Sequence, residues 1–151
     1  MAKVLIATDG SDLAVQAARE AVALLDPTIE LVVATVVPPP VLAGGAPIGA
    51  AEGVTPGVVD PQTTVELDRA LTEEAEAGLR RTIAALGIDA PARVLHGDPG
   101  AEICREAEEG GYDLVVVGSH GSGLVKRVLL GSVSHHVLHH APCPVLLVRK
   151  R

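Results

Sequence analysis

The chain has 151 residues, about the length of one domain. Hydrophobic residues make up 48% of it and charged residues 21%, a balance that excludes a disordered chain and a coiled coil. Because Phe and Trp are absent, Val, Leu, Ile and Ala must fill the core, a choice that favours β-strands flanked by alanine-rich helices. The net charge of -7 excludes a general nucleic-acid or anionic-membrane surface. An anionic ligand would therefore need a local group of donors.

Three features indicate the compartment. Cys104 and Cys143 are too few and too far apart for a disulfide framework, which favours a reducing environment. The N-terminal apolar run ends at Asp9, too soon for the hydrophobic segment of a signal peptide. Residues 31–51 carry no charge, but their prolines and glycines would break a membrane-spanning helix. We expect a soluble, cytoplasmic protein.

The first third of the chain alternates between strand and helix patterns. The apolar run at residues 3–8 predicts a strand buried on both faces, closed by Asp9 and Gly10. Ser11 or Asp12 then caps a helix that runs to about residue 25. A second buried strand is predicted at residues 29–37.

Residues 38 to about 62 are rich in Pro and Gly and nearly uncharged. They are too long for an ordinary connector and lack periodicity, so a flexible loop or lid is one interpretation. An insertion without function is the other.

The rest of the chain continues the alternation. A long helix is predicted at residues 63–86, with its apolar stripe directed inward and Gly87 at its end. That stripe consists of Val65, Leu67, Leu71, Ala75, Leu79 and Ile83. The remaining predicted elements are a strand at 92–96, a helix at 99–109, a strand at 113–117, a helix at 130–140 and a strand at 144–149.

This alternation predicts a three-layer α/β/α fold, with an open five-stranded parallel sheet and helices on both faces, in a single domain spanning residues 1–151. In such Rossmann-like sheets, ligands bind beyond the carboxyl ends of the strands. Three carboxyl ends stand out: Asp9, the pair Val36 and Val37, and Gly118.

Residues 118–134 read GSHGSGLVKRVLLGSVS, a glycine-rich stretch between a predicted strand and a predicted helix. Glycines allow consecutive backbone N–H groups to point into one concavity, and a helix N-terminus adds unpaired N–H donors and partial positive charge. The arrangement suits a phosphate. The alternative is that these residues only form a tight turn and cap the helix.

The stretch matches neither the Walker A motif nor the GxGxxG fingerprint. It does match Gly-x2-Gly-x9-Gly-Ser through Gly118, Gly121, Gly131 and Ser132, and in this it resembles the ATP-binding branch of the universal stress protein family. The resemblance extends to VLIATDGSD at the start, HGDP at residues 96–99 and HAPCPVLLVR at 140–149. It implies the adenine nucleotide alpha hydrolase-like form of the predicted fold.

The resemblance also implies an ATP site. Asp9 would accept hydrogen bonds from the ribose. Ser122 stands where many members carry a basic residue, which would weaken phosphate binding unless Lys126 or Arg127 compensates. The adenine would contact Ala7, Val36 and Val117, and the phosphates would contact Gly118, His120, Gly121, Gly131, Ser132, Val133 and Ser134.

No catalytic or metal-binding residue is predicted. His120 has no identified carboxylate partner. The histidines at 135, 136, 139 and 140 have the spacing of metal ligands, but a surface or packing role is favoured because no third ligand is evident. Neither Cys104 nor Cys143 has the surroundings of a nucleophile.

Three functions remain open. The resemblance favours an ATP-binding regulatory protein of the stress response, with ATP bound alone or with Mg²⁺. The alternatives are a slow ATPase on the same site and a binder of another adenine nucleotide such as cyclic AMP. The apolar C-terminal strand is expected at a sheet edge, where it would pair with a second copy to form a homodimer.

Overall fold

The computed structural model describes residues 1–40, 61–119 and 130–149, and in this part of the chain strands and helices alternate as predicted. Most boundaries agree with the predicted ones to within one or two residues. In chain order the elements are β1 (Lys3–Ala7), α1 (Asp12–Val22), β2 (Glu30–Val37), α2 (Pro61–Leu86), β3 (Ala92–His96), α3 (Pro99–Glu109), β4 (Leu114–Gly118), α4 (Ser132–His140) and β5 (Val145–Val148).

The five strands form one parallel sheet in the order β3-β2-β1-β4-β5. From the central β1, the chain builds outward through β2 and β3, and then returns to the other side of β1 with β4 and β5. The order therefore reverses between β1 and β4. The last strand lies at an edge of the sheet, as predicted.

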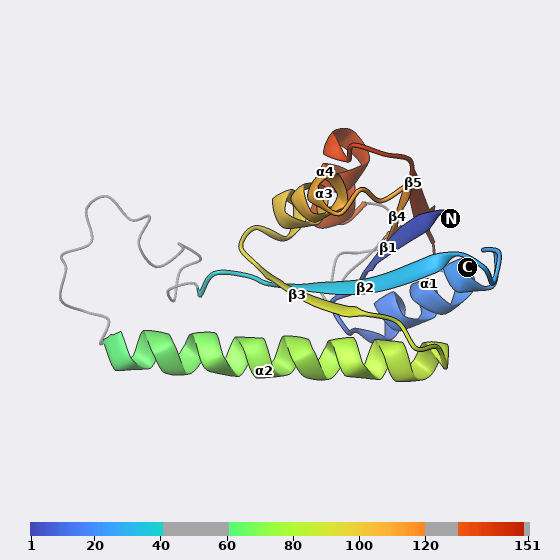
Figure 1. Ribbon diagram of the computed structural model, residues 1–151. Helices are drawn as coiled ribbons and strands as arrows, with labels where there is room; N and C mark the ends of the chain where they lie inside the picture. The colour runs from blue at the N-terminus through green and yellow to red at the C-terminus, as the bar shows by residue number, and fades with distance from the viewer. Residues whose placement is uncertain (41–60, 120–129, 150–151) are drawn as a thin grey trace.

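Two helical layers cover the sheet, with α1 and α2 on one face and α3 and α4 on the other (Figure 1). Successive residues of a strand point to opposite faces, and β1 supplies both cores in this way. Leu5 packs toward α3 and α4, whereas Val4 and Ile6 pack toward α1 and α2. All three are almost completely buried. The three-layer α/β/α prediction is confirmed.

Helix α1 begins as predicted but ends earlier. Ser11 is its N-cap, and the Ser11 hydroxyl accepts a hydrogen bond from the Ala14 N–H at 3.2 Å. The helix ends at Val22 rather than near Leu25, because Leu24 and Leu25 donate to carbonyls only three residues back and form turns. Its buried face consists of Ala14, Ala17, Ala18 and Ala21.

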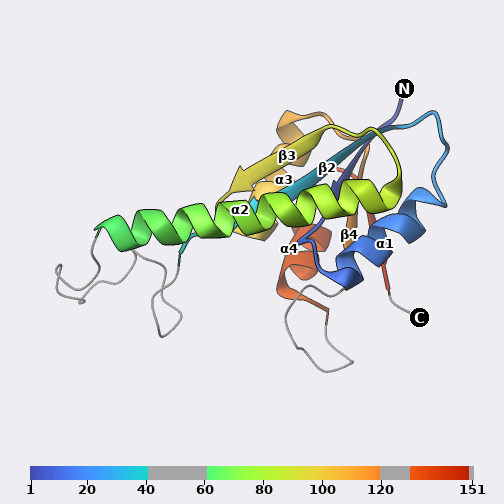
Figure 2. The same cartoon turned by 90° about the horizontal axis from the view of Figure 1, so that it is seen from below.

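The prediction that the whole apolar stripe of α2 points inward is wrong for its first half. Val65 is 68% exposed and Leu67 is 38% exposed, whereas Leu79 is 3% exposed. A helix of 26 residues is about 39 Å long, longer than the strands beneath it. Its first half therefore extends past the carboxyl edge of the sheet (Figures 1 and 2). The periodicity of a sequence indicates which side of a helix is apolar. It does not indicate how much of the helix packs on the sheet.

Within the described ranges, no helix has both the length and the apolar character needed to cross a bilayer. Even the long α2 carries charged side chains along most of its length.

Candidate functional site

A cavity of about 460 Å³ lies at the carboxyl edge of the sheet, where the strand order reverses. Its described walls are the ends of β1, β2 and β4, the N-terminal parts of α1, α3 and α4, and the middle of α2. Such reversals are the usual ligand positions of open parallel sheets. Among the residues predicted from the sequence, those lining the cavity are Ala7, Asp9, Val36, Val117, Gly118, Gly131, Ser132, Val133 and Ser134.

The other two predicted residues, His120 and Gly121, lie outside the described residues, as do Ser122, Lys126 and Arg127. In the described lining, Asp9 and Glu74 are the only ionisable side chains, and both are acidic. Any attraction of this described lining for an anion therefore comes from backbone N–H groups and hydroxyl groups, not from positively charged side chains.

The N-terminus of α4 supplies such donors. Its N-cap is Gly131, which has extended backbone angles (φ -60°, ψ 150°) and no side chain to cap the helix. By contrast, the side chains of Ser11 and Asp98 accept hydrogen bonds from the first turns of α1 and α3. The first N–H groups of a helix have no partner within it. In α4 these belong to Ser132, Val133 and Ser134, which all line the cavity, because the first helical bond is that of the His135 N–H.

Ser134 contributes differently from Ser132. It is 4% exposed, and its hydroxyl lies within hydrogen-bond distance of the carbonyls of Gly131 at 3.2 Å and Ser119 at 3.4 Å, which share its one hydrogen. The Gly131 N–H also donates to the Ser119 carbonyl at 3.0 Å. These bonds attach the start of α4 to the end of β4, so Ser134 fixes the direction of the helix. Its hydroxyl hydrogen is used within the protein.

The turn after β1 holds Asp9 beside the cavity. The Asp9 carboxylate accepts a hydrogen bond from the Ser11 N–H at 2.9 Å, which orients it locally. Gly10 has a φ of +73°, in the left-handed region that glycine adopts easily. The turn therefore presents an exposed carboxylate at the carboxyl end of the central strand.

Helix α2 provides a wall of the cavity that the sequence pattern does not predict. Leu71, Glu74 and Ala75 line the cavity from the part of α2 that reaches the carboxyl edge of the sheet. Leu71 and Ala75 belong to the apolar stripe that is predicted to point into the core. Only the crossing of α2 over the sheet, a tertiary feature, brings them to the site.

The four histidines of α4 lie in two pairs. The ring centroids are 4.5 Å apart for His135 and His139, and 4.3 Å apart for His136 and His140. His136 also packs on Gly100 of α3, where an added Cβ would lie 2.7 Å from the Cβ of His136. Among the described residues, no group of three or more His, Cys, Asp or Glu side chains is placed to hold a metal ion.

Both cysteines are partly buried and reduced. Burial raises the pKa of the Cys104 thiol, and the nearby Cys143 adds to the shift. Burial also raises the pKa of Cys143, with a smaller contribution from Asp113. A raised pKa lowers the fraction of thiolate at neutral pH. These cysteines pack against the apolar core between the sheet and α3.

The fold and the cavity define a class: an open parallel α/β protein with a cavity at its strand-order reversal. The family model described as the universal stress protein family matches residues 1–149, and the chain belongs to this family. Among curated relatives, universal stress protein YxiE from Bacillus subtilis is 34% identical, with 97% of this chain and 98% of YxiE covered. Universal stress protein MJ0531 from Methanocaldococcus jannaschii is 33% identical, covering 98% and 82%.

Solved structures agree with the fold. MJ0577 from Methanocaldococcus jannaschii superposes with a TM-score of 0.73 at 27% identity, covering 99% of this chain and 96% of that one. UspA from Lactobacillus plantarum gives 0.75 at 25% identity, with 98% and 97% covered. A universal stress protein in complex with cAMP gives 0.58 at 28% identity, with 97% and 95% covered.

Proposed function

We propose that the chain is a cytoplasmic, ATP-binding regulatory protein of the stress response, whose ligand changes its conformation or association. The observation that carries the proposal is the uncapped N-terminus of α4, which faces a cavity at the strand-order reversal. Helix N-termini in this position bind phosphate through backbone N–H groups. The relative solved in complex with cAMP supports an adenine nucleotide as the ligand class.

The cavity suits an adenine nucleotide in size and chemistry. Its volume of about 460 Å³ falls within the usual range of small-molecule sites. Ala7, Val36 and Val117 offer apolar surface for a base. Asp9 offers an acceptor for ribose hydroxyls, and Ser132 and Val133 offer N–H donors for phosphate. The base, the ribose and the phosphates would thus each contact a different kind of lining: apolar side chains, a carboxylate and backbone N–H groups.

A Mg²⁺ ion bound with the nucleotide also fits this lining. Proteins usually hold Mg²⁺ through one or two carboxylates together with substrate phosphates. With Asp9 facing the ribose, Glu74 is the carboxylate of the described lining that would hold it. When bound, the ion would neutralise charge on the phosphates.

Replacing Ser132 tests the role of the α4 backbone. Ser132 is the first residue of α4, where proline is tolerated because the N–H has no helical partner. The extended ψ of Gly131 also suits a following proline. We expect Ser132→Pro to weaken ATP binding about tenfold, the usual effect of losing one hydrogen bond to a charged group. Titration calorimetry measures this effect.

Ser132→Ala is the matched control, because it removes the hydroxyl and keeps the N–H. We expect its affinity to stay within about threefold of wild type, because the backbone donor remains. Unchanged ATP affinity in Ser132→Pro, with the fold intact by circular dichroism, would contradict phosphate binding at this helix.

Cyclic AMP is the second candidate ligand, favoured by the relative solved in complex with cAMP. It carries one negative charge against three to four on ATP. If α4 recognises the phosphates, ATP should bind more tightly and lose more affinity with added salt. Competition between the two ligands at low and high salt distinguishes them. Tighter binding of cyclic AMP at both salt concentrations would favour the second candidate.

A slow ATPase on the same site is the third candidate. In the described lining, the ionisable groups are the two carboxylates, and no lysine, arginine or histidine is present. Hydrolysis needs an oriented water and a group that stabilises the transferring phosphoryl. Sustained release of phosphate that is lost together with ATP binding in Gly131→Arg would favour this candidate.

We also propose a homodimer that forms through β5. All four residues of this edge strand are only partly buried, whereas the centres of β1 and β4 are fully buried. β5 pairs with β4 on one side and has no strand on its other side in the described sheet. An apolar edge of this kind favours pairing with a second copy.

A further inference from the structure

Helix α2 contacts the Asp9 turn through a close approach of two glycines. An added Cβ on Gly10 would lie 2.4 Å from the Cα of Gly78, and one on Gly78 would lie 2.9 Å from the Cα of Gly10. Real Cβ atoms essentially never come this near to backbone. The two backbones therefore touch only because both residues lack a side chain.

Beneath this contact, two buried hydroxyl groups connect the turn to the helix. Thr82 is completely buried and Thr8 is 6% exposed, and their hydroxyl oxygens are 3.0 Å apart. The Gly10 N–H donates to the Thr8 hydroxyl at 3.0 Å, and the Thr82 hydroxyl donates to the Gly78 carbonyl at 2.9 Å. A hydroxyl has one hydrogen to donate. Since that of Thr82 goes to Gly78, the Thr8 hydroxyl must donate to Thr82.

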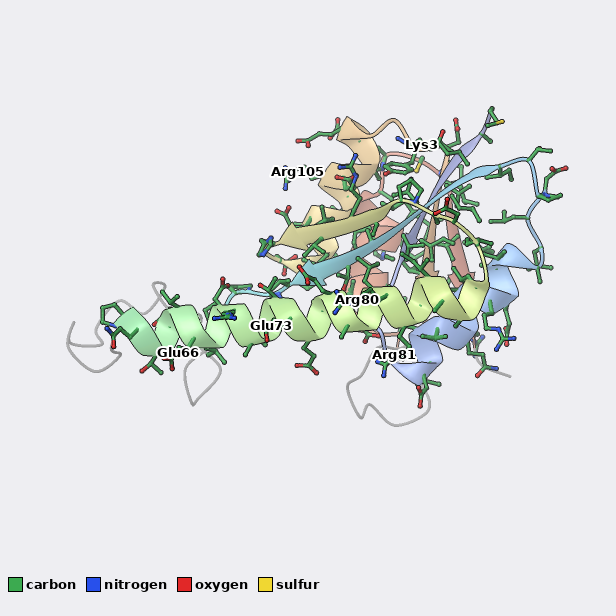
Figure 3. All side chains as sticks on the ribbon, turned by 60° about the horizontal axis from the view of Figure 1, so that its bottom comes forward. Lys3, Glu66, Glu73, Arg80, Arg81 and Arg105 are labelled. Carbon is green, nitrogen blue, oxygen red and sulfur yellow. The ribbon has the colours of Figure 1, made fainter. Side chains whose placement is uncertain are left out.

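The bonds therefore form one directed chain from the turn to α2: Gly10 N–H to Thr8, Thr8 to Thr82, and Thr82 to the Gly78 carbonyl. Every group in it is satisfied. Arg81 adds a second connection, because its guanidinium donates to the Gly10 carbonyl where α2 crosses α1 (Figure 3). Both polar backbone groups of Gly10 are thus held by contacts that depend on α2.

The position of Gly10 determines that of Asp9. The two residues are adjacent, and the Asp9 carboxylate is oriented by the next N–H after Gly10, that of Ser11. One turn of helix before Gly78, Glu74 and Ala75 line the cavity that Asp9 also lines. The same helix thus forms a wall of the cavity and fixes the turn at its base.

We infer that Thr82 and Gly78 are positioning residues for ligand selection: through the Thr8 hydroxyl and the glycine contact, they hold Asp9 where its carboxylate recognises the ribose hydroxyls of the nucleotide. This inference rests on the proposed function. It means that α2 enables the site to distinguish ribose from a sugar that lacks the 2′ and 3′ hydroxyls. Helix α4 packs on the other face of the sheet, and its N-terminus lines the same cavity without taking part in the bonds of this contact.

The test compares ATP with 2′,3′-dideoxy-ATP by titration calorimetry, and the measured quantity is the ratio of the two dissociation constants. Wild type should bind ATP at least about tenfold more tightly, because the dideoxy sugar leaves the Asp9 carboxylate without its donors. Thr82→Val keeps the shape of the side chain and removes the hydroxyl. We expect its ratio to fall below about threefold, and Thr82→Ser to restore it.

Thr72→Val is the matched control. The Thr72 hydroxyl makes the same bond to the carbonyl four residues back, that of Asp68 at 2.9 Å, on the same helix but away from the turn. Its ratio should equal that of wild type. If Thr82→Val does not fold, Gly78→Ala makes the same test, because its Cβ displaces Gly10. Its ratio should also fall.

The outcomes separate the two proposals. If wild type does not bind ATP, the proposed function fails. In a second outcome, wild type binds ATP more tightly than the dideoxy nucleotide, while Thr82→Val and Gly78→Ala keep the wild-type ratio of dissociation constants. That result overturns the positioning role of α2, and the proposed function stands. If wild type binds both nucleotides equally, the role of Asp9 in ribose recognition is wrong, and the inference is overturned with it.

Discussion

At the scale of single residues, the contact between Gly10 and Gly78 is the tightest feature of the site. Gly10→Ala would place a Cβ in left-handed backbone and 2.4 Å from the Cα of Gly78. The left-handed angle costs about 1–2 kcal/mol and the overlap about 1–3 kcal/mol more. We expect a loss of about 2–5 kcal/mol in the free energy of unfolding, measured by urea denaturation.

Gly111→Ala is the control for this substitution. Gly111 has a similar φ of +61°, but an added Cβ would meet nothing within 4 Å. Its free energy of unfolding should fall only by the cost of the left-handed backbone angle, about 1–2 kcal/mol. Equal losses in the two variants would show that α2 does not press against the turn.

At the scale of elements, α2 divides into a supported half and an extended half. Leu79 is 3% exposed in the core, so Leu79→Ala should lower the free energy of unfolding by about 2–5 kcal/mol. Val65 is 68% exposed, so Val65→Ala should change it by no more than about 0.5 kcal/mol. Chemical denaturation of both variants makes the comparison. A loss of 2 kcal/mol or more from Val65→Ala would mean that another surface covers the extended half.

The junction between α3 and β4 gives a pH prediction. Tyr112 is 5% exposed, and its hydroxyl donates to the Glu106 carboxylate at 3.2 Å. Burial, followed by the charge and hydrogen bond of Glu106, raises the pKa of Tyr112 to about 12. The unfolded chain loses this proton near pH 10 and the folded chain does not. The stabilisation is therefore complete below pH 10 and is lost as the pH rises from 10 to 12.

Tyr112→Phe removes the titrating group. We expect the free energy of unfolding of wild type to fall more steeply than that of Tyr112→Phe between pH 9 and pH 11.5. Parallel curves for the two proteins would contradict the raised pKa.

The elements differ in how far the sequence determines them. Strands such as β1 and β4 are predictable because continuous apolar runs followed by glycine are local patterns. The same patterns predict the carboxyl ends at Asp9 and Gly118, whereas the assignment of Ala7 and Val117 to the site depends on the family resemblance. The strand order and the contribution of Leu71, Glu74 and Ala75 could not be predicted, because they depend on how α2 crosses a sheet built from distant segments. No local sequence pattern predicts where α2 crosses the sheet.

At the scale of the whole molecule, β5 gives a test of the proposed dimer. The carbonyls of Pro144 and Val148 accept hydrogen bonds from β4, so the alternation of backbone groups turns those of Val145 and Leu147 toward the outer edge. Leu147→Pro removes an outward N–H and leaves the pairing with β4 intact. We expect wild type to sediment as a dimer and Leu147→Pro as a folded monomer. A wild-type monomer, or a Leu147→Pro dimer, would contradict dimerisation through this edge.

We propose that the cavity between the carboxyl ends of β1 and β4 and the N-terminus of α4 holds an adenine nucleotide. The most direct measurement is to purify the protein without added nucleotide, denature it, and identify and quantify the released small molecules by mass spectrometry, with Gly131→Arg as the variant whose side chain fills the cavity. We predict an adenine nucleotide in stoichiometric amount from wild type and none from the variant. A wild type that releases none and does not bind added ATP would contradict the claim.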